Sequence, residues 1–274
     1  MNTILVPVNF SETAHNAALY AAALAQQIGE VSVLLYHSCI ATNKDGEPAA
    51  TMYEAAQAQM EHLVASLKSV APDTAIANVI NDGLLLENIK NLSAAHPVML
   101  VVMGITGKNK VEQKLIGSNT TKVSLESGLP VLIIPAQYSF TPIDRVVLAL
   151  QLKNDLLETV PYQKINQLLH LLQAQLMVVN VADGESDTPN QYVYAGQQAA
   201  HIMFDAAGAT YHMLSERGVE QSLKTFAIEN KAQVIVSIAQ HHNFFELLFE
   251  GSLTDKLAFQ ADLPVLAIRA NAKV

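Results

Sequence analysis

Short apolar runs alternate with longer segments of helical character along the first half of the chain. The apolar runs are hydrophobic at consecutive positions, which is typical of parallel strands buried on both faces. This order of strand and helix predicts a doubly wound α/β unit around a five-stranded parallel sheet. The predicted strands are Thr3–Val8, Val31–Tyr36, Thr74–Ile80, Val98–Met103 and Val131–Ile134, and the predicted helices are Glu12–Ile28, Met52–Val70, Leu84–Ala95 and Thr120–Ser127.

The second half of the chain repeats this pattern. Three pairs of positions, Val101 and Ile235, Gly117 and Gly251, and Pro130 and Pro264, are each separated by the same 134 residues. The repeat predicts two similar α/β domains in tandem, residues 1–138 and 142–274, joined near the segment YSFTP. In the second domain the predicted strands are Arg145–Leu150, Leu176–Val181, Thr210–Leu214, Gln233–Ile238 and Leu263–Ile268, and the predicted helices are Gln191–Ala207, Gly218–Asn230 and one that opens at Gly251.

A glycine-rich loop follows the fourth predicted strand. Gly104 ends the apolar run and Gly107 follows three residues later. A lysine-bearing stretch comes next, and Gly117-Ser118-Asn119 stands at the start of a helical pattern. Glycine lets the backbone approach an anion closely, and the free N–H groups and dipole of a helix start direct positive charge toward it. The stretch therefore predicts a site for the phosphates of a nucleotide, to which Lys108, Lys110 and Lys114 could add charge.

Other polar residues follow the predicted strands. Asn9 comes after the first strand, and His37 and Ser38 come after the second. In an open parallel sheet, ligands bind at the carboxyl ends of the strands where the strand order reverses. We expect these residues near the glycine loop. For Asn9, a local Asx turn at the start of the first helix and a contact with a ligand are equally compatible with the sequence.

Composition narrows the classes of partner. The chain of 274 residues carries 16 Lys+Arg and 25 Asp+Glu, which gives a net charge of −9. Nucleic acids and anionic membranes bind basic faces, so we expect neither as a partner. The single cysteine, Cys39, forms no internal disulfide. The start of the chain lacks a basic leader, and no apolar run approaches the ~18 residues of a membrane span. Together these features predict a cytoplasmic protein.

The sequence lacks the short motifs of common enzyme classes. It contains no G-x4-G-K-[ST], G-x-S-x-G, H-E-x-x-H or C-x-x-C motif, and no G-x-G-x-x-G follows the first strand. No pair of carboxylates is placed by a motif for acid–base work. We therefore assign no catalytic residue and expect slow ATP hydrolysis at most. A nucleotide-using enzyme with its site between the two halves stays an alternative, which product formation from ATP would detect.

The glycine spacing G-x2-G-x9-G-S-N resembles the nucleotide-binding signature of the universal stress protein family. The segment ILVPVNFSETA resembles the opening strand and helix start of that family, LVVMGITG its fourth strand, and GLPVLIIP its closing strand. With the repeat, the resemblance covers nearly the whole chain and implies a tandem member. The implied fold is Rossmann-like, of the adenine-nucleotide alpha-hydrolase-like type, repeated twice.

The resemblance also implies a function and a set of site residues. A regulatory or stress-response protein would bind ATP, ADP or AMP, with or without Mg²⁺, and would order the Ile105–Ile116 loop to alter a surface for an unknown protein partner. The matching positions are Asn9, Gly104, Gly107, Gly117, Ser118 and Asn119. The family usually has an acidic residue where Asn9 stands. An asparagine still offers both a donor and an acceptor. Members tend to dimerise through the last strand, which implies a pseudo-dimer within the chain or a homodimer.

The second half departs from the signature. Ile238, His241 and Leu253 stand where the first half has Gly104, Gly107 and Asn119, and only Gly251-Ser252 is kept. Side chains at these positions fill the space that close backbone approach requires, so we expect no triphosphate to bind there in the same way. The apolar loop from His241 to Glu250 supports an alternative function, a protein-interaction or dimerisation module that needs no nucleotide.

Overall fold

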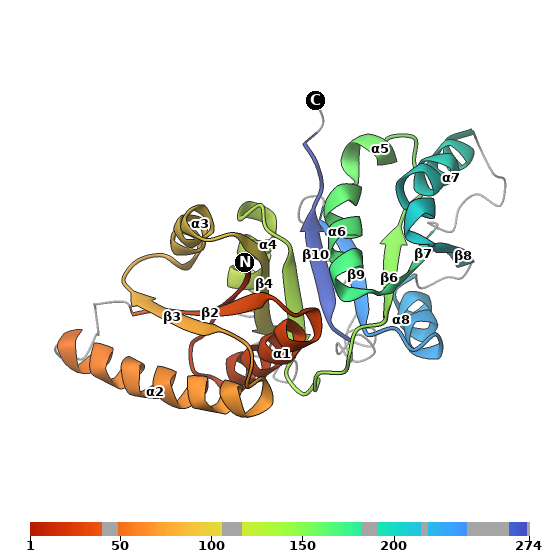
Figure 1. The fold of residues 1–274 in the computed structure, drawn as a ribbon. Coiled ribbons are helices and arrows are strands. Elements are labelled where there is room, and N and C mark those ends of the chain that lie inside the picture. The colour runs from red at the N-terminus through yellow and green to blue at the C-terminus, as the bar shows by residue number, and fades with distance from the viewer. Residues whose placement is uncertain (40–48, 106–116, 182–190, 215–218, 240–262, 273–274) are drawn as a thin grey trace. The chain divides into compact units, whose positions relative to one another are not determined.

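The computed structural model describes residues 1–39, 49–105, 117–181, 191–214, 219–239 and 263–272 (Figure 1). These residues form two compact units, Met1–Phe140 and Thr141–Val274. Each unit has its own parallel sheet with helices packed against it, so the predicted tandem α/β fold class is confirmed.

The first unit is doubly wound. Its strands follow the order β3-β2-β1-β4-β5, and all neighbouring pairs are parallel. Helices α1 and α2 cover one face of the sheet, and α3 and α4 cover the other (Figure 1). The elements are β1 (Asn2–Pro7), α1 (Glu12–Ile28), β2 (Val31–Ser38), α2 (Ala49–Val70), β3 (Ile76–Asn81), α3 (Leu85–Ala95), β4 (Val98–Ile105), α4 (Gly117–Glu126) and β5 (Val131–Pro135).

The second unit repeats the strand order as β8-β7-β6-β9-β10, again with parallel neighbours. Its elements are β6 (Arg145–Leu150), α5 (Leu156–Thr159), α6 (Tyr162–Leu172), β7 (Gln175–Val181), α7 (Gln191–Phe204), a 3₁₀ turn (Asp205–Ala207), β8 (Thr210–Leu214), α8 (Val219–Glu229), β9 (Val234–Ala239) and β10 (Val265–Arg269). The shared order gives the sequence repeat a structural counterpart.

Burial explains the consecutive apolar residues of the strands. Ile4, Leu5 and Val6 of β1 are fully buried, as are Val101 and Val102 of β4, because helices cover both faces of the sheet. Burial on both faces removes the alternation of polar and apolar positions that one-sided sheets show. The core of each unit therefore lies in and immediately around its central strands.

Two parts of the structure differ from the sequence prediction. The segment between β6 and β7 contains α5 and α6, for which no helix was predicted. Helix α5 is only four residues long. Pro161 separates it from α6, because proline has no backbone N–H to continue the helical hydrogen bonds. Helix α4 begins at Gly117 rather than at Thr120. Gly117, Ser118 and Asn119 therefore form its first turn, where backbone N–H groups have no partner within the helix.

Helix α1 begins and ends as its sequence predicts. The Ser11 hydroxyl accepts a hydrogen bond from the Ala14 N–H at 3.3 Å, which makes Ser11 the N-cap. Gly29 follows the last residue with φ of 72° and donates its N–H to the Ala25 carbonyl. The buried face of the helix is rich in alanine, so its backbone can lie close to the sheet.

Gly104, near the end of β4, permits the closest approach of α1 to the sheet. A Cβ atom at this position would overlap the Thr13 carbonyl oxygen and lie 2.7 Å from the Thr13 carbonyl carbon. Both of those atoms belong to the main chain and cannot rotate away. The first turn of α1 and the end of β4 are therefore in backbone contact, which only glycine at position 104 allows.

Side chains of α1 also hold the segment that follows β5. The Asn16 Nδ2 atom donates to the carbonyl oxygens of Pro135 at 3.2 Å and Tyr138 at 3.1 Å. The ring of Tyr20 packs edge-on against Phe140, with centroids 5.0 Å apart. The C-terminal end of the first unit is thus fixed to the helix that packs against the centre of its sheet.

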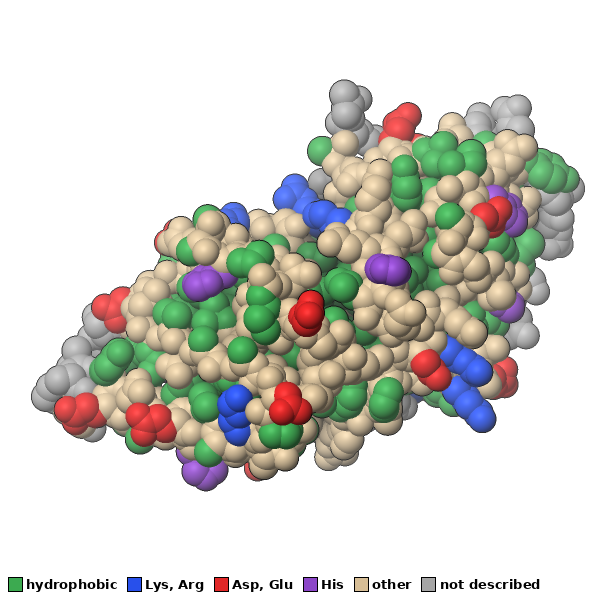
Figure 2. Space-filling view, in the orientation of Figure 1, with side chains coloured by type: hydrophobic (Ala, Val, Ile, Leu, Met, Phe, Trp, Pro, Cys, Tyr) green, Lys and Arg blue, Asp and Glu red, His purple; other side chains and the backbone are tan. Residues whose placement is uncertain are grey.

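Among the described residues, no helix combines the length and the hydrophobicity needed to cross a bilayer. On the face shown in Figure 2, acidic and basic side chains are interspersed with polar and apolar ones.

We predict that Gly104→Ala lowers the free energy of unfolding by about 3 kcal/mol, because the added methyl group forces α1 away from β4. Urea denaturation would measure this loss. Gly128→Ala is the comparison, because a methyl group at Gly128 meets no atom within 4 Å and only its φ of 75° opposes the change. That substitution should cost about 1 kcal/mol. Equal losses in the two variants would contradict the packing role of Gly104.

We predict that Asn16→Asp destabilises the protein by about 2 kcal/mol at neutral pH, because a carboxylate would face two carbonyl oxygens without a proton to donate. The loss should shrink under acidic conditions, where the introduced carboxyl group is protonated. Asn91→Asp on the exposed side of α3 makes the same change of charge and should be nearly neutral in urea denaturation. A similar loss in both variants would show that the added charge, rather than the lost donor, matters.

Candidate functional site

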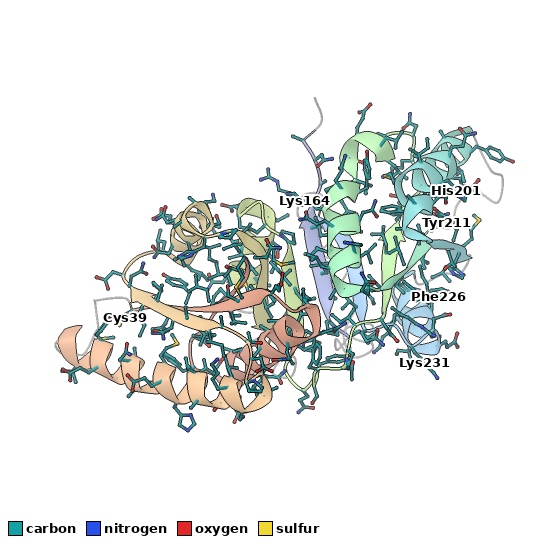
Figure 3. The ribbon with its side chains drawn as sticks, in the orientation of Figure 1. Cys39, Lys164, His201, Tyr211, Phe226 and Lys231 are labelled. Atoms are coloured by element: carbon teal, nitrogen blue, oxygen red, sulfur yellow. The ribbon has the colours of Figure 1, made fainter. Side chains whose placement is uncertain are left out.

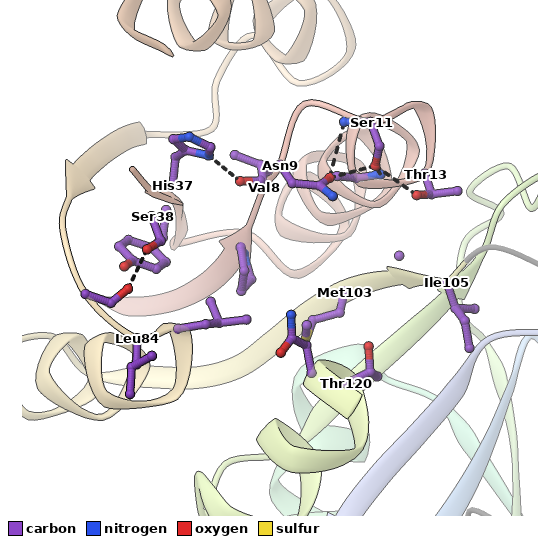
Figure 4. Close-up of a pocket in the computed structure, with 17 residues that line it drawn as sticks. Val8, Asn9, Ser11, Thr13, His37, Ser38, Leu84, Met103, Ile105 and Thr120 are labelled. Carbon is purple, nitrogen blue, oxygen red and sulfur yellow. Dashed lines mark hydrogen bonds between the residues drawn. The ribbon is translucent and has the colours of Figure 1, made fainter. Parts of the chain in front are cut away.

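A cleft of about 700 Å³ opens at the carboxyl ends of the central strands of the first unit (Figure 4). It lies where β1 and β4 are neighbours and the chain continues to helices on opposite faces of the sheet, which is the usual ligand position in this architecture. The described residues that line it are Pro7, Val8, Asn9, Ser11, Thr13, Ala14, Tyr36, His37, Ser38, Gly83, Leu84, Leu85, Met103, Gly104, Ile105, Asn119 and Thr120.

The β1–α1 side of the cleft is held by a short hydrogen-bond chain. The Asn9 Oδ1 atom accepts from the Ser11 backbone N–H at 3.2 Å and from the Ser11 hydroxyl at 2.7 Å. The Ser11 and Thr13 hydroxyl oxygens are 3.0 Å apart (Figure 4). The Asx turn at Asn9 is therefore present, and it orients an exposed side chain that also lines the cleft.

His37 is oriented by the backbone of β1. Its Nδ1 atom lies 2.8 Å from the Val8 carbonyl oxygen (Figure 4). A carbonyl can only accept, so Nδ1 carries the proton. The ring also contacts Phe10, whose φ of 58° is unusual for a residue other than glycine, with centroids 4.5 Å apart. The turn after β1 and the end of β2 thus support each other at the cleft.

The β2–α3 side combines a polar edge with an exposed apolar residue. The Ser38 hydroxyl donates to the Gly83 carbonyl oxygen at 2.6 Å, which leaves the serine oxygen as an acceptor. The Tyr36 hydroxyl is buried, and burial raises the pKa of this group, while the nearby side chains of Ser38 and Asn88 act to lower it. Leu84, immediately before α3, is 63% exposed although it lines the cleft. A ligand would cover this side chain.

The opposite side of the cleft is formed by β4 and the start of α4. Asn119 is exposed there, and Thr120 beside it is buried. Gly104 lines the same side, but the contact with α1 already requires glycine at that position. Packing against α1 is therefore a reason for glycine at position 104 that is separate from the predicted approach of an anion.

The structure brings together only some of the predicted site residues. Asn9, Gly104 and Asn119 line one cleft. Gly117 and Ser118 belong to the first turn of α4, but their surroundings lie outside the described part of the chain. Gly107 and the lysines of the loop also lie outside it, as do His241, Gly251, Ser252 and Leu253 in the second half.

Sequence reasoning did not single out Thr13, Tyr36, Leu84 or Thr120 as cleft residues. These side chains come from four different elements or their ends, so no local spacing marks them. The available signal was the position of Leu84 after Asn81-Asp82-Gly83, a turn that closes β3 at the ligand edge of the sheet.

The described lining of the cleft has no formally charged side chain. No Asp, Glu, Lys or Arg is among its described lining residues. No group of three His, Cys, Asp or Glu side chains that could hold a metal ion occurs in the described ranges. Cys39 follows β2, is buried, and donates its backbone N–H to the Asn81 carbonyl (Figure 3). The described part of the cleft therefore offers neutral hydrogen-bonding groups and apolar side chains.

In the second unit, the ends of β6 and β7, which correspond to β1 and β2, have different contacts. The buried Asn180 side chain, at the end of β7, accepts a hydrogen bond from the Leu152 backbone N–H at 3.2 Å. Gly196 of α7 lets the helix lie against the same loop, since a Cβ there would be 2.8 Å from the Lys153 nitrogen. The loop after β6 is thus bonded to β7 and packed against α7.

A polar cluster of the second unit joins α7 to β8. Asp205 accepts hydrogen bonds from the Tyr211 hydroxyl at 2.6 Å and from His201 at 2.9 Å (Figure 3). These bonds, first that from Tyr211, lower the pKa of Asp205. All three groups serve to connect the helix to the edge strand, and the cluster lies on a different unit from the cleft.

Solved structures share this architecture. A universal stress protein from Archaeoglobus fulgidus DSM 4304 is 16% identical, with a TM-score of 0.70 over 98% of this chain and 96% of that one. The cytoplasmic domain of a prokaryotic cation chloride cotransporter is 13% identical, with a TM-score of 0.55 over 98% of this chain and 95% of that one. At these identities the likeness shows the fold alone.

A third solved structure is a universal stress protein in complex with cAMP. It is 20% identical and covers 48% of this chain and 96% of its own, with a TM-score of 0.41. No curated protein matches the sequence at a significant level. The model of the universal stress protein family matches residues 1–135, which span every strand and helix of the first unit. Through these residues, the chain belongs to the universal stress protein family.

Proposed function

We propose that the first unit binds an adenine nucleotide, ATP, ADP or AMP, and that the protein acts as a cytoplasmic stress-response regulator with little or no hydrolysis. The observation that carries this proposal is the cleft at the β1–β4 junction, which faces the first turn of α4. Membership of a family in which one member has been solved with cAMP supports a nucleotide as the ligand.

The phosphates would lie toward α4. Its first turn, Gly117-Ser118-Asn119, has backbone N–H groups without helical partners, and the helix dipole favours an anion there. Gly107 belongs to the proposed phosphate loop by its sequence spacing. The base would lie toward Val8 and Leu84, where an apolar wall is open to solvent.

The proposed absence of efficient catalysis follows from the same lining. The described residues of the cleft include no carboxylate to act as a general base or to hold Mg²⁺. Mg²⁺ would therefore be bound mainly by the phosphates, with hydroxyl and amide oxygens of Ser, Thr or Asn as its available protein ligands.

The second unit is proposed to be a degenerate universal stress protein domain that does not bind the same ligand. The hydrogen bond between Asn180 and Leu152 occupies the polar group at the end of β7, and α7 packs closely on the loop after β6. Pairing through the last strand, within the chain or between two copies, stays a prediction.

We predict that millimolar ATP with Mg²⁺ raises the thermal stability of the protein, and that Gly117→Val abolishes this effect by blocking the first turn of α4. A ligand that binds only the folded state stabilises it by about 2.7 kcal/mol at a hundredfold excess over its dissociation constant. A thermal-shift titration, with circular dichroism to verify folding, measures both points. Gly251→Val makes the same change at the repeated position of the second half and should keep the ATP effect.

The alternative interaction module predicts a different result. If the parent protein shows no ATP effect, the nucleotide proposal is wrong. Replacement of Phe244 and Phe245 by polar residues should then change oligomerisation, as light scattering would detect. An ATP effect that Gly251→Val removes, and that Gly117→Val keeps, would place the site in the second half and contradict the assignment to the first.

A further inference from the structure

Leu84 occupies a position at the start of α3 where a polar residue would serve the fold better. It is the N-cap residue of the helix, with backbone angles of φ −77° and ψ 135°. Serine, threonine, aspartate or asparagine at an N-cap accepts a hydrogen bond from a free N–H of the first turn, and leucine has no atom that can do so. Helix α1, which starts at the same edge of the sheet, has such a cap in Ser11. Helix capping therefore does not explain leucine at position 84.

Core packing does not explain this leucine either. Its side chain lines the cleft and is 63% exposed, whereas Val8 and Met103, which line the same cleft, are buried. Most of the apolar surface of Leu84 therefore remains in contact with water, where it contributes little to the stability of the first unit.

The backbone that carries Leu84 is held in place by three hydrogen bonds. Each of the three residues before it accepts one bond at its carbonyl oxygen, in chain order from the Cys39 N–H at 2.9 Å, the Asn88 Nδ2 atom at 2.8 Å and the Ser38 hydroxyl at 2.6 Å (Figure 4). Gly83 has a φ of 111°, and a Cβ atom there would lie 3.0 Å from the Asn88 Nδ2 atom. The exposed side chain thus projects from a fixed turn.

An apolar side chain on a fixed turn at the edge of a cleft is suited to contact a ligand. Ligand pockets are lined mainly by apolar side chains, and binding costs less when the contacting groups are already ordered. A ligand that covers Leu84 also removes its apolar surface from water, which favours binding. Ligand contact thus accounts for both the exposure of the leucine and the bonds that fix its backbone.

Resting on the proposed nucleotide site, we propose that Leu84 is a binding residue of the cleft, present at the N-cap of α3 for its contact with the base. In a nucleotide only the base offers a flat apolar face, because the phosphates are charged and the ribose carries hydroxyl groups. Ser38 and Asn88 act on the ligand through Leu84, since their side chains hold the turn from which it projects.

Two substitutions separate contact with the ligand from support of the fold. Leu84→Ser and Leu84→Ala both remove the apolar contact, but only serine supplies a cap. Both should weaken ATP binding about fivefold to tenfold, the effect of leaving much of one leucine side chain without a partner. The serine variant should melt about 2 to 4 °C above the alanine variant. We also expect it to melt no lower than the parent.

The measurements are isothermal titration calorimetry of the full chain with ATP and Mg²⁺, and thermal unfolding without nucleotide. Leu84→Met keeps an apolar side chain of similar volume and should bind ATP within about twofold of the parent. Leu157→Ser is the matched control, because Leu157 is an exposed leucine in α5 of the second unit. This control should leave the dissociation constant of ATP unchanged.

Each other outcome overturns a defined part of the argument. ATP binding by Leu84→Ser and Leu84→Ala that equals that of the parent would overturn the role of Leu84 and leave the nucleotide site standing. An equal loss in Leu157→Ser would do the same. A serine variant that melts well below the parent would show that the leucine supports the fold, and would overturn the inference as well. A parent protein that binds no ATP would overturn the proposed function and this inference together.

Discussion

The backbone contact between the first turn of α1 and the end of β4 is the constraint on which the first unit depends. A residue with a side chain at Gly104 would overlap the Thr13 carbonyl, so the contact exists only because that position is glycine. The contact places the turn after β1 directly beside β4. The cleft lies along this junction, and its two sides would separate if α1 moved outward. Packing in the core and the shape of the site thus share one cause.

The N-cap of the same helix also orients a side chain that lines the cleft. The Ser11 hydroxyl accepts from the Ala14 N–H at the start of α1, and the Ser11 N–H and hydroxyl both donate to the Asn9 Oδ1 atom. The exposed Asn9 side chain is consequently oriented by hydrogen bonds from the residue that caps α1. A change at Asn9 would alter what the cleft presents without removing the cap, since the bond between Ser11 and Ala14 does not involve it.

The two units have the same strand order but different contacts at the carboxyl ends of their strands. In the first unit, the side chains of Asn9, Ser38 and Leu84 border an open cleft. In the second unit, Asn180 is buried and bonded to the loop after β6, and α7 lies on the same loop. The cytoplasmic domain of a cation chloride cotransporter and a universal stress protein share the fold at low identity. Architecture alone therefore does not determine the ligand, and the arguments for one rest on the residues at the strand ends.

The sequence by itself determined the layers of this protein. Runs such as Val98–Met103 predict buried parallel strands because covering both faces of a sheet removes alternation, and the 134-residue repeat predicts the second unit. It did not predict α5, because four residues are too few to show a helical period. It did not predict α6 either, although Ile165, Leu168 and Leu169 have helical spacing there and are buried. Only the tertiary structure decided that Gly104 is needed for packing, that Leu84 and Thr120 line the same cleft, and that the Asn9 amide oxygen accepts two hydrogen bonds from Ser11. The first two properties depend on contacts between segments that are distant in the chain. The third depends on which atom of the Asn9 amide faces Ser11, and the local residue order does not specify such contacts.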